Sequence, residues 1–204
     1  MTYPPDQFAD RHIQLAIFRL NDMCVNVQDG MESFLTTASL EKMPGVDATF
    51  SWLRRRGVRI CLLSDFDRRQ TLTLLERVGW SVDEDGTVQQ VITGQQAYDN
   101  PVRLAQEAAG LQNSRFSFSV ADTPRLLKLA NEARVHFNLA VCNGRHPYHD
   151  LAVVPHHAML DSLLQLPNFL LEHLPEAAVA QVAAPRPGRR FLPRLRLPRP
   201  LSGL

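Results

Sequence analysis

The chain has 204 residues, of which 45% are hydrophobic and 21% charged, so it can form one hydrophobic core of ordinary size. Its formal net charge of +1 conceals an uneven distribution of charge along the chain. No run of ~18 apolar residues occurs, and residues 1–12 combine acids with prolines. The sequence therefore predicts neither a transmembrane segment nor a secretory leader, and we expect a cytoplasmic protein.

Six short runs of β-branched and apolar residues predict buried strands: 13–18, 58–63, 88–93, 116–120, 137–142 and 158–160. Amphipathic stretches of helical period lie between most of them: 46–56, 68–78, 102–109, 124–133 and 160–171. This alternation predicts an α/β fold of three layers, with a mainly parallel, Rossmann-like sheet covered by helices on both faces. In such sheets ligands bind at the carboxyl ends of the strands, which here follow Phe18, Leu63 and Val120.

The ordered pattern stops near Ala178, so we expect a core at residues 1–178 and a flexible or extended arm at 179–204. Five prolines between Pro185 and Pro200 disfavour a long helix there. The last 20 residues carry six arginines and no acid, which leaves 16 basic and 21 acidic residues in the first 184. Such a basic arm is expected to bind an acidic protein surface, a nucleic acid, an anionic membrane or its own body.

Neither the cysteines nor the histidines form a recognisable metal-binding pattern. Cys24, Cys61 and Cys142 are odd in number and widely spaced, which favours reduced, buried thiols over a disulfide framework or a zinc site. The histidines near the C-terminal strands lack an acid or cysteine to complete a ligand set: His146, His149, His156 and His157. We therefore predict no metal site from these residues.

Polar residues follow three of the predicted strands, in the segments 19–22, 64–67 and 121–124. A hydroxyl or a backbone amide after a strand can hold phosphate at a helix N-terminus, and carboxylates at neighbouring strand ends can hold Mg²⁺. These segments therefore indicate phosphate chemistry, although each one alone is a weak signal.

Taken together, the segments resemble the haloacid dehalogenase (HAD)-like hydrolase superfamily, and within it the phosphonatase-like branch. Residues 13–25 are similar to the first family motif, and residues 63–69 to the second. Val120–Pro124 is similar to the fourth motif, and residues 142–162 to the closing strand and helix. The resemblance covers roughly residues 12–172. It implies a phosphohydrolase fold in which an Asp attacks phosphorus, a second Asp transfers the proton, and Mg²⁺ is bound.

This sequence departs from the family at the positions that the resemblance makes catalytic. Arg19 stands where the nucleophilic Asp is expected, and Asn21 stands where the acid/base Asp is expected. Arginine stays protonated and cannot attack phosphorus, and asparagine cannot transfer the proton. The third motif has no basic residue in 93–101, and Leu126 replaces the second acid of the fourth. An alternative register would make Asp22 the nucleophile.

Of the expected set only Ser64 and Asp122 remain, so no Mg²⁺ or other cofactor is expected unless this interpretation of the motifs is wrong. We predict instead that the guanidinium of Arg19 pairs with Asp122 in bidentate geometry and supplies the positive charge of the missing metal. The degenerate motif positions are thus Arg19, Asn21, Ser64 and Asp122. If phosphate still binds, Arg19, Ser64 and Asp122 are the candidate ligands.

The segment between Val25 and Met43 has space for one helix, expected at 31–40, but not for the cap domain that many relatives insert there. The former active-site face should therefore be open. The resemblance implies that capless members tend to act on or bind macromolecules.

These observations favour a catalytically inactive pseudoenzyme that serves as a scaffold, adaptor or regulatory subunit by protein–protein interaction in a bacterial-type cytoplasm. The open face and the arm are the expected partner-binding surfaces. In the arm, the candidate contacts are Arg189, Arg190, Phe191, Leu192, Arg194, Leu195 and Arg196, for an acidic or aromatic groove. A phospho-ligand sensor without hydrolysis and a divergent HAD-type phosphatase remain the alternatives, and nucleic acid remains an unsupported alternative partner.

Overall fold

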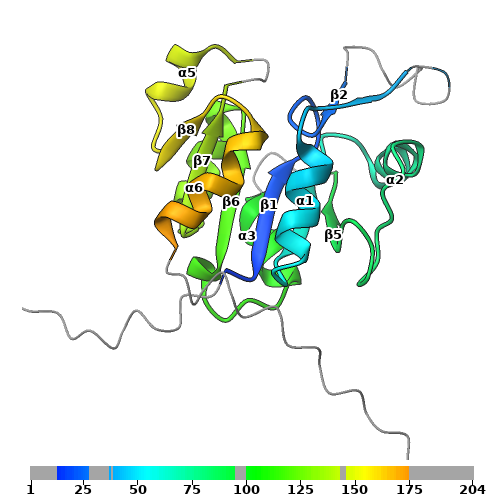
Figure 1. Ribbon diagram of the computed structural model, residues 1–204, viewed down its shortest axis with the longest axis horizontal. Coiled ribbons are helices and arrows are strands. Elements are labelled where there is room, and N and C mark those ends of the chain that lie inside the picture. The colour runs from blue at the N-terminus through cyan, green and yellow to red at the C-terminus, as the bar shows by residue number, and fades with distance from the viewer. Residues whose placement is uncertain (1–12, 28–36, 38, 95–99, 143–145, 175–204) are drawn as a thin grey trace, which may run out of the picture.

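The computed structural model describes residues 13–27, 37, 39–94, 100–142 and 146–174 (Figure 1). The arm at 179–204 and its candidate contact residues lie outside this range. Within it, eight strands and six α-helices alternate along the chain. The sheet is the element that places the candidate site, because its central strands bring distant segments together.

Six parallel strands form the main sheet in the order β5-β4-β1-β6-β7-β8. Their bounds are β1 Leu15–Arg19, β4 Arg59–Leu63, β5 Gln90–Ile92, β6 Ser117–Ala121, β7 Phe137–Val141 and β8 Ala158–Leu160. All six strands predicted from the sequence are present. The order reverses between β1 and β6, so the two central strands end at the switch point where ligands of parallel sheets usually bind.

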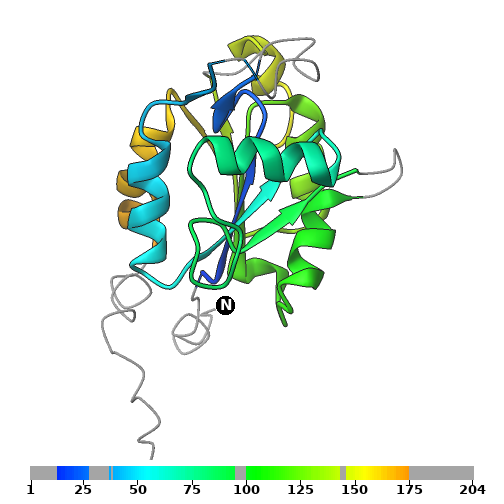
Figure 2. The same cartoon turned by 90° about the vertical axis from the view of Figure 1, so that its right-hand side faces the viewer.

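Helices cover both faces of this sheet, as the sequence predicts (Figures 1 and 2). One face carries α1 Val46–Arg54, α2 Arg68–Arg77 and α6 Leu166–His173; the other carries α3 Pro101–Ala108, α4 Pro124–Glu132 and α5 Tyr148–Ala152. Right-handed crossovers explain why α1 and α2 lie on one face and α3, α4 and α5 on the other. The chain first runs from β1 through β4 to β5 and then crosses back to β6 and runs in the opposite direction to β8. The result is the three-layer α/β core.

The two faces are filled by different side chains. Phe18 of β1 packs against Phe50 of α1, with ring centroids 5.0 Å apart, and against Phe118 of β6 at 6.0 Å. The opposite face uses smaller residues, such as Ala105 and Ala130, which let α3 and α4 lie close to the strands. Both layers therefore hold β1 rigidly between its neighbours, and Arg19 is the last residue of that strand.

The segment after β1 contains two short strands that the sequence did not predict. A two-stranded antiparallel pair is formed by β2 Val25–Asn26 and β3 Glu41–Lys42. Residues 28–36 and 38, where most of the expected helix falls, lie outside the described residues, and Leu40 is not helical. The described residues form no cap domain over the carboxyl end of the sheet. In the same part of the chain, no helix has the length and apolar character needed to span a membrane.

The cysteines follow the expectation with one difference. All three are free thiols; Cys24 and Cys61 are buried, whereas Cys142 is partly exposed. Burial raises the pKa of the Cys61 thiol, which keeps it in the inert neutral form.

Gly45, at the N-terminus of α1, provides a direct test of how α1 packs against the segment that precedes α6. Its φ is +82°, and an added Cβ would overlap the Leu164 side chain. We expect Gly45→Ala to destabilise the protein by about 2–4 kcal/mol, through left-handed strain and overpacking together. Gly79→Ala is the matched control, because Gly79 has φ +73° but open space around it. Urea unfolding of both variants measures the difference; equal losses would contradict the packing argument.

Candidate functional site

Arg19 lies at the centre of the carboxyl edge of the sheet, where the ends of β4 and β6 flank it. Only 12% of its side chain is exposed. Its Nη2 donates to Asp65 Oδ2 at 2.6 Å, and its Nη1 donates to Asp122 Oδ1 and Oδ2 at 3.2 and 3.3 Å. Nη1 also donates to the backbone carbonyl of Asn21 at 2.7 Å. The guanidinium thus joins the ends of three neighbouring strands.

The predicted pairing of Arg19 with Asp122 is present, but its geometry differs from the prediction. A bidentate pair would use two nitrogens on one carboxylate, whereas here Nη1 alone contacts both oxygens of Asp122. The second nitrogen is taken by Asp65, which the sequence had not marked as a partner. Because β4 lies directly beside β1, the position of Asp65 two residues past Leu63 was the signal that could have identified it.

The carboxylates that surround Arg19 differ in burial. The Asp122 side chain is fully buried, whereas that of Asp65 is 60% exposed. Burial raises the pKa of Asp122, and the charge and hydrogen bond of Arg19 offset part of that rise. For Arg19, burial lowers the pKa, but the charges of Asp122 and Asp65 outweigh it and the pKa is raised. Arg19 is therefore a permanent cation, and its charge is what makes an ionised Asp122 tolerable in the interior.

Asn21 and Ser64 are both buried, and their side chains accept hydrogen bonds from the segment that follows β4. Asn21 Oδ1 accepts a hydrogen bond from the backbone N–H of Asp65 at 3.0 Å, so it holds that residue in place beside Arg19. Ser64 Oγ accepts hydrogen bonds from the backbone N–H of Phe66 at 3.2 Å and from Thr71 Oγ1 at 2.8 Å. The Ser64 hydroxyl thus faces α2 and is not among the residues that line the pocket described below.

Asp22, the alternative nucleophile, lies in a tight turn after β1 with φ 62°. Its Oδ1 accepts a hydrogen bond from the backbone N–H of Val27, and its Oδ2 is 3.8 Å from Arg19 Nη1. The side chain is 11% exposed. The Asp22 carboxylate therefore stabilises the turn and adds negative charge near Arg19. If Asp22 were the nucleophile, the acid/base residue would be expected at position 24, which is the buried Cys24.

Mg²⁺, which the family resemblance implies, does not fit these residues as they are arranged. Arg19 Nη1 occupies the space between Asp122 and the Asn21 carbonyl, the oxygens that could otherwise coordinate a cation. A fixed guanidinium and a divalent cation cannot share this space, because like charges repel strongly in a partly buried site. Across the described ranges, no group of three His, Cys, Asp or Glu side chains is placed to hold a metal.

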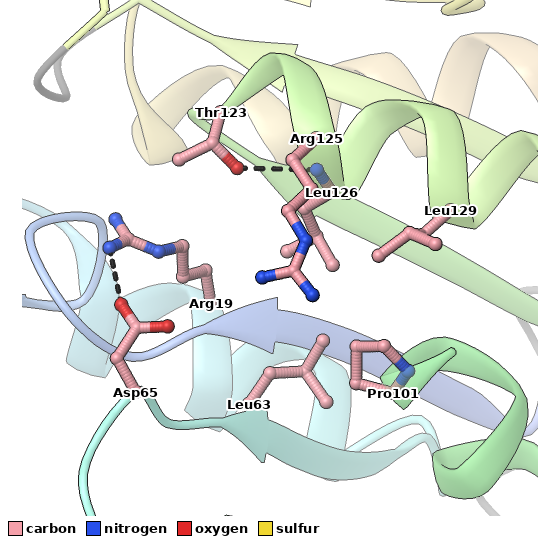
Figure 3. Close-up of a pocket in the computed structure, with 8 residues that line it drawn as sticks. All are labelled: Arg19, Leu63, Asp65, Pro101, Thr123, Arg125, Leu126 and Leu129. Carbon is pink, nitrogen blue, oxygen red and sulfur yellow. Dashed lines mark hydrogen bonds and ion pairs between the residues drawn. The ribbon is translucent and has the colours of Figure 1, made fainter. Parts of the chain in front are cut away.

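A small pocket of about 50 Å³ opens beside Arg19 and Asp65 (Figure 3). That volume holds a few water molecules. Half of its lining residues are apolar and come from β4, α3 and α4: Leu63, Pro101, Leu126 and Leu129. In Figure 3 the Arg125 side chain extends from α4 over Leu63. The sequence argument did not single out Arg125, although its place in the first turn of the helix after Asp122 was a usable signal.

Comparisons with known proteins identify the fold. No protein-family model and no curated protein matches the sequence. A haloacid dehalogenase-like hydrolase from Bacteroides fragilis is similar in structure, with a TM-score of 0.60 and 15% identity over 75% of this chain and 99% of its own. A predicted phosphatase from Clostridium acetobutylicum has a TM-score of 0.64 and 13% identity over 79% and 99%.

A third similar structure is the D,D-heptose 1,7-bisphosphate phosphatase from B. bronchiseptica, which was solved with magnesium and phosphate. It has a TM-score of 0.59 and 16% identity over 78% of this chain and 98% of its own. These likenesses show that the chain has the fold of HAD-like hydrolases. At such low identity they show the fold alone, so activity has to be argued from the residues around Arg19.

Proposed function

We propose that this protein is a non-catalytic binding module of the HAD-like fold, a pseudoenzyme that acts as a scaffold, adaptor or regulatory subunit through its open carboxyl-end face. The observation that carries the proposal is the place of Arg19. Its guanidinium contacts Asp65, Asp122 and the Asn21 carbonyl, and so fills the position from which a nucleophile and a metal would act. We further propose that the protein belongs to the phosphonatase-like branch and works in the cytoplasm without a metal cofactor.

The contacts of Arg19 support a structural role for the former catalytic residues. Phosphoryl transfer requires an attacking anion next to a bound phosphate, and such an anion cannot be the cation at the end of β1. Asp122 is fully buried behind Arg19, and Asn21 is engaged with the loop after β4. Each surviving motif residue thus stabilises its neighbours, and none is free to take part in proton transfer.

A phospho-ligand sensor is the second candidate, and Arg125 is the observation that favours it. Its guanidinium lines the pocket beside Arg19, and none of the described residues pairs with it. Against this stand the charges around the pocket: Asp22, Asp65 and Asp122 outnumber the two arginines. A phosphate dianion would therefore meet little net positive charge, and Ser64 is turned away from the pocket.

One set of titrations separates these candidates. For the binding module we expect thermal melts with EDTA and with Mg²⁺ to coincide, no turnover of a generic phosphate ester, and no saturable binding of inorganic phosphate by calorimetry. Saturable phosphate binding that Arg125→Ala abolishes and the exposed Arg115→Ala preserves would favour the sensor. Turnover lost in Asp22→Ala or Asp122→Ala would overturn the proposal in favour of a divergent phosphatase.

A further inference from the structure

A second hollow lies away from the Arg19 site, on the side of α2. It is a shallow groove of about 430 Å³ between α2 and the loop that follows it. Its apolar lining consists of Leu72, Leu75, Trp80 and Val82. Leu72 is 38% exposed, one of few large apolar side chains on the described surface. An open apolar groove of this kind is a candidate docking surface.

One carboxylate, that of Glu76 of α2, lines this groove. Three more, those of Asp83, Glu84 and Asp85, follow Val82 in the loop beside it, where Glu84 and Asp85 also line a neighbouring hollow. All four are exposed, and none of their carboxylates has an ion pair or hydrogen bond within the described part of the chain. Cations lie nearby as well. Arg77 has a partner of its own, and Arg54 donates to the backbone carbonyl of Asp85, which anchors the loop. Lys42 lies over the ring of Trp80, 5.4 Å from its centroid, and forms an ion pair with Asp47. The loop beside the groove is therefore acidic, and its carboxylates and that of Glu76 are available for pairing.

The chain itself contains a segment with the complementary pattern. Its last 20 residues carry six arginines and no acid, whereas the first 184 residues have five more acids than bases. Within residues 189–197, the apolar residues Phe191, Leu192, Leu195 and Leu197 alternate with arginines. Apolar side chains between guanidiniums complement an apolar groove with carboxylates beside it, in chemical character and in sign of charge.

The segment is long enough to reach the groove. The described chain ends at Leu174, just after α6, and the 14 residues from there to position 189 span up to roughly 46 Å when extended. A folded body of this size is about 40 Å across, from the usual scaling of the radius of gyration. A tethered segment also has a high effective concentration, on the order of millimolar, so that modest affinity is enough for binding.

We propose that residues 189–197 bind this groove of the same molecule, with their arginines on Glu76 and the 83–85 carboxylates and their apolar side chains against Leu72 and Val82. This inference goes beyond the proposed function, because it does not depend on Arg19 or on the open face. It identifies the body of the protein as the first partner of its own basic arm.

Limited trypsin digestion of the full chain tests this binding, because cleavage after the arm's arginines tracks the fraction of time the arm is free. We expect Glu76→Gln/Glu84→Gln to speed cleavage after Arg190 at least fivefold relative to the native chain. The matched control is Glu107→Gln/Glu132→Gln, which removes two exposed carboxylates on the other face of the sheet and should leave the rate within twofold. At ~1 M NaCl the difference should shrink, because salt screens the pairs.

Equal cleavage of the groove variant, the control and the native chain would overturn the proposal. Protection of the arm from trypsin that disappears when the protein is diluted tenfold would also overturn the proposal, because the arm would then bind a second copy of the chain. A second readout is hydrogen exchange of residues 72–82 in the full chain, which we expect to be faster in Phe191→Ser/Leu192→Ser. Unchanged exchange in that variant would contradict apolar docking in the groove.

Discussion

Replacing Arg19 by Met is expected to destabilise the protein by about 3–5 kcal/mol at pH 7, the usual cost of removing one partner from a buried ion pair. Asp122 is fully buried, and Arg19 is the cation that contacts it. Without Arg19 the carboxylate must either stay ionised and unpaired or take up a proton. Urea unfolding monitored by circular dichroism measures the loss, and Arg68→Met at the exposed start of α2 should cost less than about 0.5 kcal/mol.

The pH dependence of this loss distinguishes electrostatics from packing. Burial raises the pKa of Asp122 and Arg19 lowers it, so the pKa of Asp122 should be higher in Arg19→Met than in the native protein. A carboxyl group whose folded pKa lies above its unfolded value of ~3.9 stabilises the protein at low pH, and the stability is lost as pH rises through the folded pKa. The difference in unfolding free energy between the native protein and Arg19→Met should therefore increase from pH 4.5 to pH 7. A difference in unfolding free energy that stays constant with pH would mean that Arg19 contributes through packing alone.

Most of the fold could be predicted from the sequence because parallel strands buried on both faces leave a strong local signal. Runs such as 58–63 and 137–142 are continuous and apolar between amphipathic stretches, and each became a strand within about two residues of its predicted ends. The pairing of β2 with β3 was missed because each strand has only two residues. The five-residue helix α5 was missed for the same reason, since one turn has no detectable period.

The site was predictable only in part, because contacts between strand ends depend on register and rotamer. Arg19 and Asp122 could be brought together from the order of motifs along one sheet. The position of Asp65 two residues after Leu63 could mark it as a neighbour of Arg19. The contact itself also depends on the register of β1 against β4 and on the hydrogen bond that Asn21 Oδ1 accepts from the Asp65 backbone N–H. Ser64 points toward α2 because Thr71 lies one helical turn inside that helix, a tertiary contact that no motif spacing encodes.

If Arg19 takes the place of a metal ion, introducing carboxylates at and near its position should create a metal site. In Arg19→Asp/Asn21→Asp, the new side chain at 19 lies beside Asp122 and the backbone carbonyl of residue 21, both of which contact the guanidinium in the native protein. Carboxylate and carbonyl oxygens with water are suitable ligands for Mg²⁺. With the arginine removed, the repulsion among the carboxylates should itself favour binding of a divalent cation.

We therefore expect Mg²⁺ to raise the melting temperature of Arg19→Asp/Asn21→Asp and to leave that of the native chain unchanged. At a hundredfold excess over its dissociation constant the ion would add about 2.7 kcal/mol, or roughly 5–10 °C for a body of this size. Adding Asp122→Asn to the double variant is the control, because it removes one charged ligand while keeping the shape of the side chain. Loss of the Mg²⁺ effect in that triple variant would place the ion where the guanidinium now lies. The same shift in the native chain would mean that cations bind elsewhere and that Arg19 does not exclude them.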